Sequence, residues 1–386
     1  MGSLEPAGPP LDIQVNLATN LSPVPRPGTT DFYALGHTDH IISARWTSAK
    51  GWETPNLEPY GNLSIAPTAS CLHYATECFE GMKCYRGYDG KLRLFRPDCN
   101  GERLAMSAAR GSLPLFPPGD LKHLVAKLLE IDGHRWLPKD LPGNYLYIRP
   151  AMIGLGMKLG YRLPDEALLF IVATPYKDLS QSPEGKQLSL KLQCSPPDAV
   201  RAWPGGFGYA KLGANYGPSL EAHRNAVAAG FDQILWLYGE ERWITEAGAS
   251  NLFLIWKNRD TGKIELVTPS LQNKMILSGI TRRSILEIVR SRFTKPIGDL
   301  EAMDVVERDI NMSDVQAAHN EGRLLEAFVA GTAYFLTSVS LIAAEDQVIK
   351  IPVRQDKGGY YHCLKTWMED ITYGREDNEW AYEIEG

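Results

Sequence analysis

The chain has 386 residues, of which 44% are hydrophobic, so it can bury a large core and we expect two domains. Its formal net charge is −6, with acidic and basic residues mixed along the chain. This argues against a nucleic-acid partner, because phosphate binding requires a basic surface. No run of about 18 apolar residues occurs, so we expect no membrane span.

The predicted elements alternate between strands and helices. Residues 1–28 are rich in Pro, Gly and Asn and predict an irregular N-terminal arm. The next stretch predicts strands near residues 41–46, 92–95, 145–148 and 168–173, and helices near 100–109 and 121–131. Residues 175–187 predict a linker, followed by strands at 188–193, 233–238 and 252–256 and helices at 219–229 and 280–293. This alternation is typical of α/β layers.

The spacing of the cysteines and the composition of residues 1–20 indicate the cellular compartment of the protein. The six cysteines have no Cys-x-x-Cys or other metal-binding spacing, and a chain of this length does not need disulfides. Residues 1–20 contain Glu5 and Asp12 but no Arg or Lys, which is atypical of a mitochondrial presequence, and they lack the apolar stretch of a signal peptide. We therefore expect free thiols and a cytoplasmic location.

A lysine among small residues is the first candidate for chemistry. Residues 208–219 read GYAKLGANYGPS, which places Lys211 between glycines and Tyr216 five residues further on. The small residues leave room for a ligand at the lysine amine, and the tyrosine supplies a phenol beside it. This arrangement suits a lysine that forms a Schiff base with a carbonyl cofactor. A solvated lysine in an ordinary glycine-rich loop is the alternative.

A second cluster supplies an acid. Residues 243–255 read WITEAGASNLFLI and predict a turn leading into a hydrophobic strand, with Glu246 just ahead of the strand. Pyridoxal phosphate needs an acidic residue against its pyridine nitrogen, so that the protonated ring can act as an electron sink. Glu246 fits that role, although a carboxylate in solvent at a strand end is the alternative. The closeness of the two clusters in the sequence favours a cofactor site.

Further motifs in the same order resemble the branched-chain amino-acid aminotransferases, which are pyridoxal-phosphate enzymes of fold type IV. The matching stretches are residues 73–83 (HYATECFEGMK), 93–97 (RLFRP) leading to Arg103, 145–150 (YLYIRP) and 331–333 (GTA). The class-wide signature of Glu246, 251–253 (NLF), 268–269 (TP) and 279–281 (GIT) is complete. The resemblance covers residues 39–380. It implies a small domain at 29–174, a larger cofactor-binding domain at 188–386, and pyridoxal 5′-phosphate at their interface.

The resemblance also assigns roles around the cofactor. Lys211 would hold the cofactor and then move the proton between the substrate and the cofactor, which gives ping-pong kinetics. Glu246 would keep the ring nitrogen protonated, and Tyr216 would bind the phenolate oxygen. The phosphate would be bound by Arg103, Ile280, Thr281 and Thr332. Taken from the residues alone, Arg103 suits a bidentate phosphate contact but could be a surface charge, and residues 278–281 could be an ordinary helix cap.

For the substrate, the resemblance implies a pocket formed by aromatic, polar and turn residues. These are Tyr74, Phe79, Tyr147, Arg149, Tyr161, His37, Thr332 and Ala333. Taken singly, each aromatic is more often core packing. The resemblance further implies a homodimer, in which Tyr74 and residues 159–161 (LGY) reach the site of the partner.

Departures from the family pattern concern the side-chain pocket. His37 stands where an aromatic is usual, Tyr161 where a small aliphatic residue is usual, and Ala249-Ser250 where Thr-Met is usual. The Cys-x-x-Cys that some members carry after Gly-Thr-Ala is absent, with Tyr334 and Thr337 in its place. The changes at His37, Tyr161 and Ala249-Ser250 predict a donor range that is broadened or shifted towards larger or partly polar side chains.

Three functions stay open at this point. The leading one is amino transfer between a branched-chain or related hydrophobic L-amino acid and 2-oxoglutarate, so the partners are small amino acids and 2-oxo acids. The others are a type IV transaminase or lyase acting on a D-amino acid, an amine or a larger substrate, and a catalytically silent binder of pyridoxal phosphate. A metal site at His37 and His40 is not expected, because no further ligand has a convincing spacing.

Overall fold

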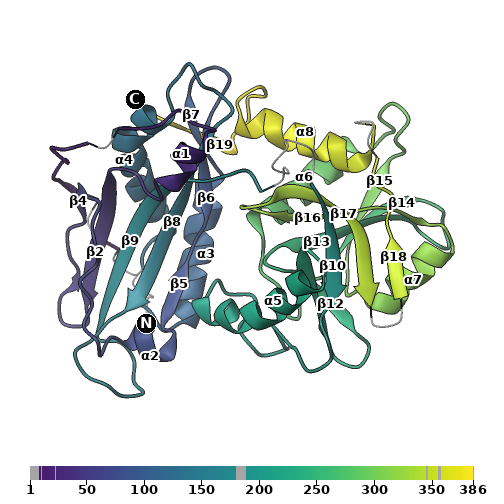
Figure 1. The fold of residues 1–386 in the computed structure, drawn as a ribbon, viewed down its shortest axis with the longest axis horizontal. Coiled ribbons are helices and arrows are strands. Elements are labelled where there is room, and N and C mark those ends of the chain that lie inside the picture. The colour runs from purple at the N-terminus through teal and green to yellow at the C-terminus, as the bar shows by residue number, and fades with distance from the viewer. Residues whose placement is uncertain are drawn as a thin grey trace, which may run out of the picture. The chain divides into compact units, whose positions relative to one another are not determined.

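The computed structural model describes residues 8–9, 11–21, 23–179, 188–344, 347–354 and 358–385. These residues form two compact units, and each unit is built on one β-sheet with helices against it (Figure 1). The first unit groups residues 1–177, 210–214 and 369–386, and the second groups residues 178–209 and 215–368.

The sheet of the first unit has ten described strands and is antiparallel except at its edge. Its order is β1 (Gln14–Val15), β4 (Asn56–Pro59), β2 (His40–Thr47), β9 (Glu166–Pro175), β8 (Tyr145–Gly154), β6 (Met82–Arg86), β7 (Leu92–Phe95) and β19 (Ala381–Ile384). Off this path, β3 (Gly51–Trp52) pairs with β2, and β5 (Glu77–Phe79) pairs with β8. Only β1 and β4 pair in parallel among these strands. The pairing of β5 with β8 fixes the residue after β5, Glu80, beside the centre of the sheet.

Two long helices of the first unit pack against each other, α3 (Pro97–Arg110) and α4 (Pro118–Trp136). In α4 the residues Leu121, Leu124, Val125, Leu128 and Leu129 are fully buried, and their spacing marks one face of a helix. Shorter helices are α1 (Thr30–Ala34) and α2 (Ser70–Tyr74). The helix α3, which packs against α4, carries several residues of the candidate site.

The second unit contains a mixed sheet of nine described strands. Its order is β12 (Trp243–Ala247), β11 (Gln233–Tyr238), β10 (Ser189–Cys194), β17 (Phe335–Ala344), β16 (Leu324–Gly331), β13 (Asn251–Lys257), β14 (Ile264–Thr268) and β15 (Met303–Glu307). The strand β18 (Gln347–Lys350) pairs with β17. The helices are α5 (Leu220–Ala228), α6 (Ile280–Arg292), α7 (Met312–Asn320) and α8 (Tyr360–Thr372), the last of which ends in residues grouped with the first unit.

The core of the second unit follows from strands that are buried on both faces. Residues 251–256 of β13 are all buried, which explains the unbroken apolar run in that part of the sequence. The rings of Phe253 and Phe328 stack with their centroids 4.9 Å apart and join β13 to β16. This packing holds β13 and β16 together, and Asn251 and Gly331 lie at their neighbouring ends.

The predicted elements are confirmed, with differences at their ends and in their grouping. The strand predicted at 145–148 continues to Gly154, and the helix predicted at 219–229 begins with a 3₁₀ turn at Gly217–Ser219. The expected domain of residues 188–386 differs from the observed unit, because β19 pairs with β7 in the first sheet and residues 210–214 also group there. The expected arm contains β1, which is paired, and most of the expected linker at 175–187 lies outside the described residues.

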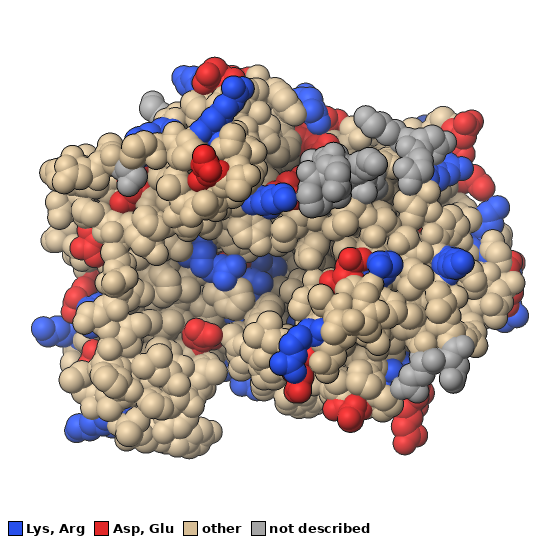
Figure 2. Space-filling model, viewed as in Figure 1, with Lys and Arg blue, Asp and Glu red and all other residues tan. Residues whose placement is uncertain are grey.

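The described helices and surface add two observations. None of the described helices is both long and apolar enough to cross a membrane. On the face drawn in Figure 2, Lys and Arg side chains are interspersed with Asp and Glu, as the mixed charge of the sequence predicts.

Candidate active site

Lys211 is held in the first unit by backbone hydrogen bonds on both of its sides. The Lys211 N–H donates to Ser107 Oγ of α3 at 2.9 Å, and its carbonyl accepts from the Phe79 N–H at 3.1 Å. The next residue, Leu212, forms an antiparallel bridge with Cys78 of β5. A Cβ added at Gly213 would lie 1.7 Å from Glu77 Oε1, so only glycine fits there. The small residues around Lys211 therefore let this segment lie against β5 and α3.

The Lys211 amine lies over an aromatic ring in this cluster. Its Nζ is 4.7 Å from the centroid of the Phe79 ring, and the Arg149 guanidinium carbon is also 4.7 Å from it. Arg149 Nη2 donates to Tyr147 Oη at 3.3 Å. A Cβ at Gly81 would lie 2.0 Å from Tyr147 Oη, which explains the glycine of the FEG motif. Four residues predicted for the site, Lys211, Phe79, Tyr147 and Arg149, are thus brought together.

Arg103 is paired with a carboxylate that the sequence reasoning did not assign. Glu80 is fully buried, and Arg103 donates to it from Nε to Oε1 at 2.6 Å and from Nη2 to Oε2 at 2.8 Å. Asn100 Nδ2 and the Gly81 N–H donate to Oε2 at 2.7 and 3.1 Å. Asn100, Arg103 and Ser107 lie on one face of α3, because they are three and four residues apart. The Nε edge of Arg103 is therefore occupied by Glu80, so a phosphate would be bound by another part of the guanidinium.

The electrostatics of Glu80 connect Arg103 to Lys211. Burial acts to raise the pKa of Glu80, but the charge and hydrogen bonds of Arg103, the charge of Lys211 and the Asn100 amide together hold that pKa below its ordinary value. Glu80 is therefore an anion that both cations stabilise. Glu80 is the acid of the FEG motif, which the sequence analysis noted. No local sequence pattern reveals that an acid beside an aromatic residue is buried.

The other predicted substrate residues of the first unit form aromatic pairs of their own. The His37 ring stacks on Tyr60 with centroids 3.6 Å apart, and His37 Nδ1 lies 2.8 Å from the Thr38 carbonyl oxygen. Tyr161 is 97% exposed and meets Tyr74 edge-on at 6.3 Å. None of these contacts involves the cluster around Lys211.

Glu246 is the central acid of the second unit. It is 2% exposed and lies within β12, a strand that was not predicted; the predicted turn follows it and leads into the predicted hydrophobic strand, β13. Arg201 Nη2 lies 2.5 Å from Glu246 Oε2. Oε1 accepts from the Leu277 N–H at 2.9 Å and from Asn251 Nδ2 at 3.3 Å. Glu246 is thus a buried, oriented carboxylate, and Arg201 is a partner that the sequence reasoning missed.

Packing explains how these partners reach Glu246. Ala202, next to Arg201, is buried against Met275 and Ile276, which precede Leu277. This contact brings the loop of Arg201 and the loop of Leu277 to the same end of β12. No local motif places an arginine there, which is why Arg201 was not predicted.

The remaining predicted cofactor residues lie at a helix start and at two turns of the second unit. Ile280 and Thr281 form the first turn of α6, whose N-cap is Gly279 and has no side-chain cap. The first N–H groups of a helix lack partners within the helix and favour an anion. A Cβ at Gly279 would lie 2.1 Å from Asn251 Oδ1, so the helix start and Glu246 share Asn251. Thr332 and Ala333 form the turn between β16 and β17, and Tyr216 precedes the 3₁₀ turn at Gly217–Ser219.

The chemistry of these residues fits pyridoxal 5′-phosphate. The cofactor requires an amine, an acid for the ring nitrogen and donors for a phosphate. Groups of these kinds are present in each unit: Lys211 and Arg103 in the first, and Glu246 and the start of α6 in the second. Three buried guanidinium atoms, Arg149 Nε, Arg201 Nη1 and Arg282 Nε, have no hydrogen-bond partner among the described residues. Buried donors of this kind are usually satisfied by a ligand or an ordered water.

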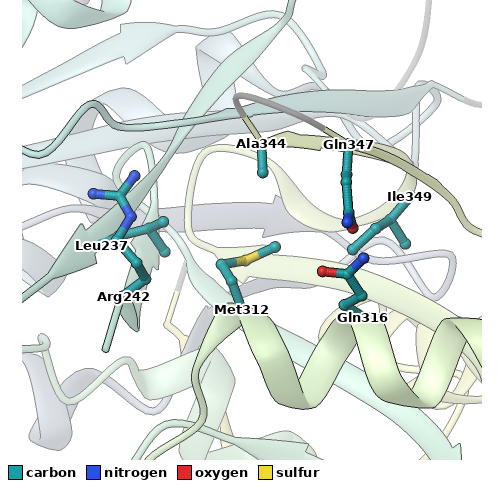
Figure 3. A pocket seen from close by; sticks show the side chains of 7 residues that line it. All are labelled: Leu237, Arg242, Met312, Gln316, Ala344, Gln347 and Ile349. Atoms are coloured by element: carbon teal, nitrogen blue, oxygen red, sulfur yellow. The ribbon is translucent and has the colours of Figure 1, made fainter. Parts of the chain in front are cut away.

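Two other features of the described residues were considered as sites. A cavity of about 220 Å³ in the second unit lies between α7, β11, β17 and β18, with Met312 pointing into it and Gln316 and Gln347 on one side (Figure 3). It is smaller than the roughly 300–1,000 Å³ of typical ligand pockets and contains none of the predicted site residues. No group of three or more His, Cys, Asp or Glu side chains that could hold a metal ion occurs in the described ranges.

Comparison with known sequences shows the family to which the chain belongs. The family described as amino-transferase class IV matches residues 77–342. The chain is 41% identical to the cytosolic branched-chain-amino-acid aminotransferase of Mus musculus, over 97% of this chain and 92% of that protein. It is also 41% identical to the mitochondrial branched-chain-amino-acid aminotransferase of Schizosaccharomyces pombe, over 96% of this chain and 84% of that protein.

Solved structures show the same fold. The branched-chain amino acid aminotransferase of Thermobaculum terrenum in its PLP form has a TM-score of 0.68 and 21% identity, and covers 91% of this chain and 100% of its own. The Escherichia coli enzyme has a TM-score of 0.67 and 20% identity, and covers 89% of this chain and 99% of its own. The expectation of a type IV fold with two α/β units is confirmed.

Proposed function

Since this chain belongs to the class IV aminotransferases, and within them to the branched-chain-amino-acid aminotransferases, we propose that it transfers the amino group of a branched-chain or related hydrophobic L-amino acid to 2-oxoglutarate. The observation that carries the proposal is the cluster in which Lys211 lies over Phe79 while its charge and that of Arg103 act on the buried Glu80. The class IV aminotransferases depend on pyridoxal 5′-phosphate, which supplies a carbonyl for the substrate amine and an electron-accepting ring when bound.

Each proposed residue has a defined role in the reaction. Lys211 Nζ would hold the cofactor covalently and, once released, would take the proton from the substrate α-carbon and return one during amino transfer. Glu246 would accept a hydrogen bond from the protonated ring nitrogen, and Tyr216 would orient the phenolate oxygen. Arg103, the N–H groups of Ile280 and Thr281, and Thr332 would hold the phosphate.

We assign the substrate to the aromatic cluster beside Lys211. Phe79 and Tyr147 would bury an apolar side chain, and Arg149 is oriented by Tyr147 and lies over the same ring as Lys211. Thr332 and Ala333 would receive the carboxylate. The residue before them, Gly331, lies against Ser250, because a Cβ at Gly331 would lie 3.0 Å from Ser250 Oγ. His37, Tyr161, Ala249 and Ser250 differ from the family pattern, so we propose that they broaden or shift the donor range.

A donor panel with 2-oxoglutarate as acceptor tests this function. We expect L-leucine, L-isoleucine and L-valine to be used, L-methionine or L-phenylalanine to compete with them, and D-leucine and simple primary amines to be poor donors. Addition of glutamate should convert the cofactor spectrum to that of the aminated form. Use of D-leucine or an amine in preference to L-leucine would indicate another type IV activity, and an unchanged spectrum would indicate a silent binder.

The variant Tyr161→Val should move the ratio of kcat/KM for phenylalanine and leucine towards leucine.

We propose that the functional unit is a homodimer formed through the loop that contains Tyr161. Met157, Leu159, Tyr161 and Leu163 are all exposed in the first unit, and an exposed apolar group of this kind is typical of an interface. Leu159→Asp should therefore lower the dimer fraction measured by analytical ultracentrifugation. Val348→Asp, which adds the same charge at another exposed apolar position, serves as the control. An unchanged dimer in Leu159→Asp, or a monomer in the native protein, would exclude this interface.

We propose a cytoplasmic location. The relatives include cytosolic and mitochondrial enzymes, so the family alone does not decide between them. No disulfide joins any of the six cysteines, and thiols are the usual state in a reducing compartment.

A further inference from the structure

Arg201 is the cation in direct contact with the buried acid of the second unit. Its Nη2 lies 2.5 Å from Glu246 Oε2, and both side chains are 3% exposed. Two further donors to Glu246, the Leu277 N–H and Asn251 Nδ2, are neutral. Arg282 also acts on Glu246 through its charge, but its hydrogen bonds go to the Pro269 carbonyl and to Glu307. Arg201 is therefore the partner on which the ionised state of Glu246 depends most directly.

The charge of Glu246 decides where a proton lies between it and a heterocyclic nitrogen. A buried carboxylate without a cation tends to take up a proton, because the charged form is poorly solvated. A carboxylate paired with arginine stays ionised and can only accept hydrogen bonds. If Glu246 is protonated, a ring nitrogen beside it could stay neutral. If Glu246 is ionised, the ring nitrogen must carry the proton itself.

We propose that Arg201 is a positioning residue that keeps Glu246 ionised and oriented, so that the proton resides on the pyridine nitrogen of the cofactor. This inference rests on the proposed role of Glu246 as the partner of that nitrogen. The pair also fixes the direction of the carboxylate, since Arg201 occupies Oε2 while Leu277 and Asn251 occupy Oε1. A merely structural ion pair would stabilise the fold without setting the protonation of the ring.

The test measures the ring nitrogen itself. The holoenzyme, Arg201→Met, Arg201→Lys and Glu246→Gln are loaded with pyridoxal 5′-phosphate labelled with ¹⁵N in the ring, and the ¹⁵N chemical shift is recorded by NMR. We expect the native enzyme to give the shift of a protonated pyridinium and Arg201→Met to move towards neutral pyridine. Arg201→Lys, which keeps the charge, should restore most of the native shift. The kcat of Arg201→Met should be about tenfold or more below the native value. This is the loss expected when the pKa of the ring nitrogen falls by about one unit and the protonated fraction falls about tenfold.

The outcomes separate this inference from the proposed function. A native ¹⁵N shift in Arg201→Met would overturn the role of Arg201, whatever the effect on kcat. A native shift in Glu246→Gln would instead overturn the role of Glu246 in the proposed function. If Arg201→Met does not fold, Arg201→Gln, which keeps a hydrogen-bond donor but no charge, carries the same expectation, and a native shift in it would equally overturn the inference.

Discussion

Replacing Lys211 by alanine is expected to lower kcat for amino transfer by about 10⁴-fold or more, because the attachment point of the cofactor and the proton carrier are lost together. The backbone of this segment should stay in place, since the hydrogen bonds to Ser107 and Phe79 come from main-chain atoms of Lys211. The measurement is single-turnover kinetics with L-leucine. Borohydride reduction followed by mass spectrometry should add the cofactor mass to the peptide of Lys211 in the native protein only.

A matched lysine variant controls for a general effect of losing a positive charge. Lys263 is exposed and pairs with the exposed Asp304, so Lys263→Ala should keep native turnover and the native adduct. Near-native turnover in Lys211→Ala, or an adduct at another lysine in the native protein, would show that the lysine has been misassigned.

Much of the fold was predictable where the sequence has a strong local period. The five apolar residues of α4 at 121, 124, 125, 128 and 129 are spaced for one helix face, and all are fully buried. The run in β13 is apolar throughout and is buried on both faces. In such segments the local pattern and the tertiary packing favour the same structure.

Long-range pairing explains the elements that were missed. The strand β17 pairs in parallel with β10, about 150 residues earlier in the chain. The sequence of β17 alone does not indicate which strand it pairs with. The C-terminal strand β19 pairs with β7 in the first unit, so the grouping of residues 369–386 depends on a partner in another part of the chain. Neither pairing has a signature in its own sequence.

The residues of the candidate site also fall into those that a local motif predicts and those that depend on a distant partner. Lys211 and Glu246 were predicted because small residues and an acid stand in recognisable motifs. Glu80 and Arg201 were not, because their roles depend on ion pairs between residues that are 23 or more positions apart. The structure thus adds a buried counter-ion to each half of the predicted chemistry.

Glu80→Gln should lower the free energy of unfolding of the cofactor-free protein by about 3–5 kcal/mol at neutral pH, because it leaves Arg103 as a buried cation without its carboxylate. The effect has a defined pH dependence. The folded-state pKa of Glu80 lies below its ordinary value of 4.5, so its stabilisation is present above that value and is lost as pH falls through the lower folded pKa. Urea unfolding at several pH values should therefore show the native protein and the variant converging in acid.

The double variant Glu80→Leu with Arg103→Met separates stability from cofactor binding. Replacing a buried ion pair by apolar residues of similar size is often neutral, so the double variant should regain most of the lost stability. It should still bind pyridoxal 5′-phosphate more weakly than the native protein, because the arginine assigned to the phosphate is gone. If Glu80→Gln lowers the free energy of unfolding by less than about 1 kcal/mol, the pair contributes no more than an exposed ion pair does, which would contradict its burial. Native cofactor affinity in the double variant would show that Arg103 does not bind the phosphate and that Glu80 and Arg103 only hold α3 against β5.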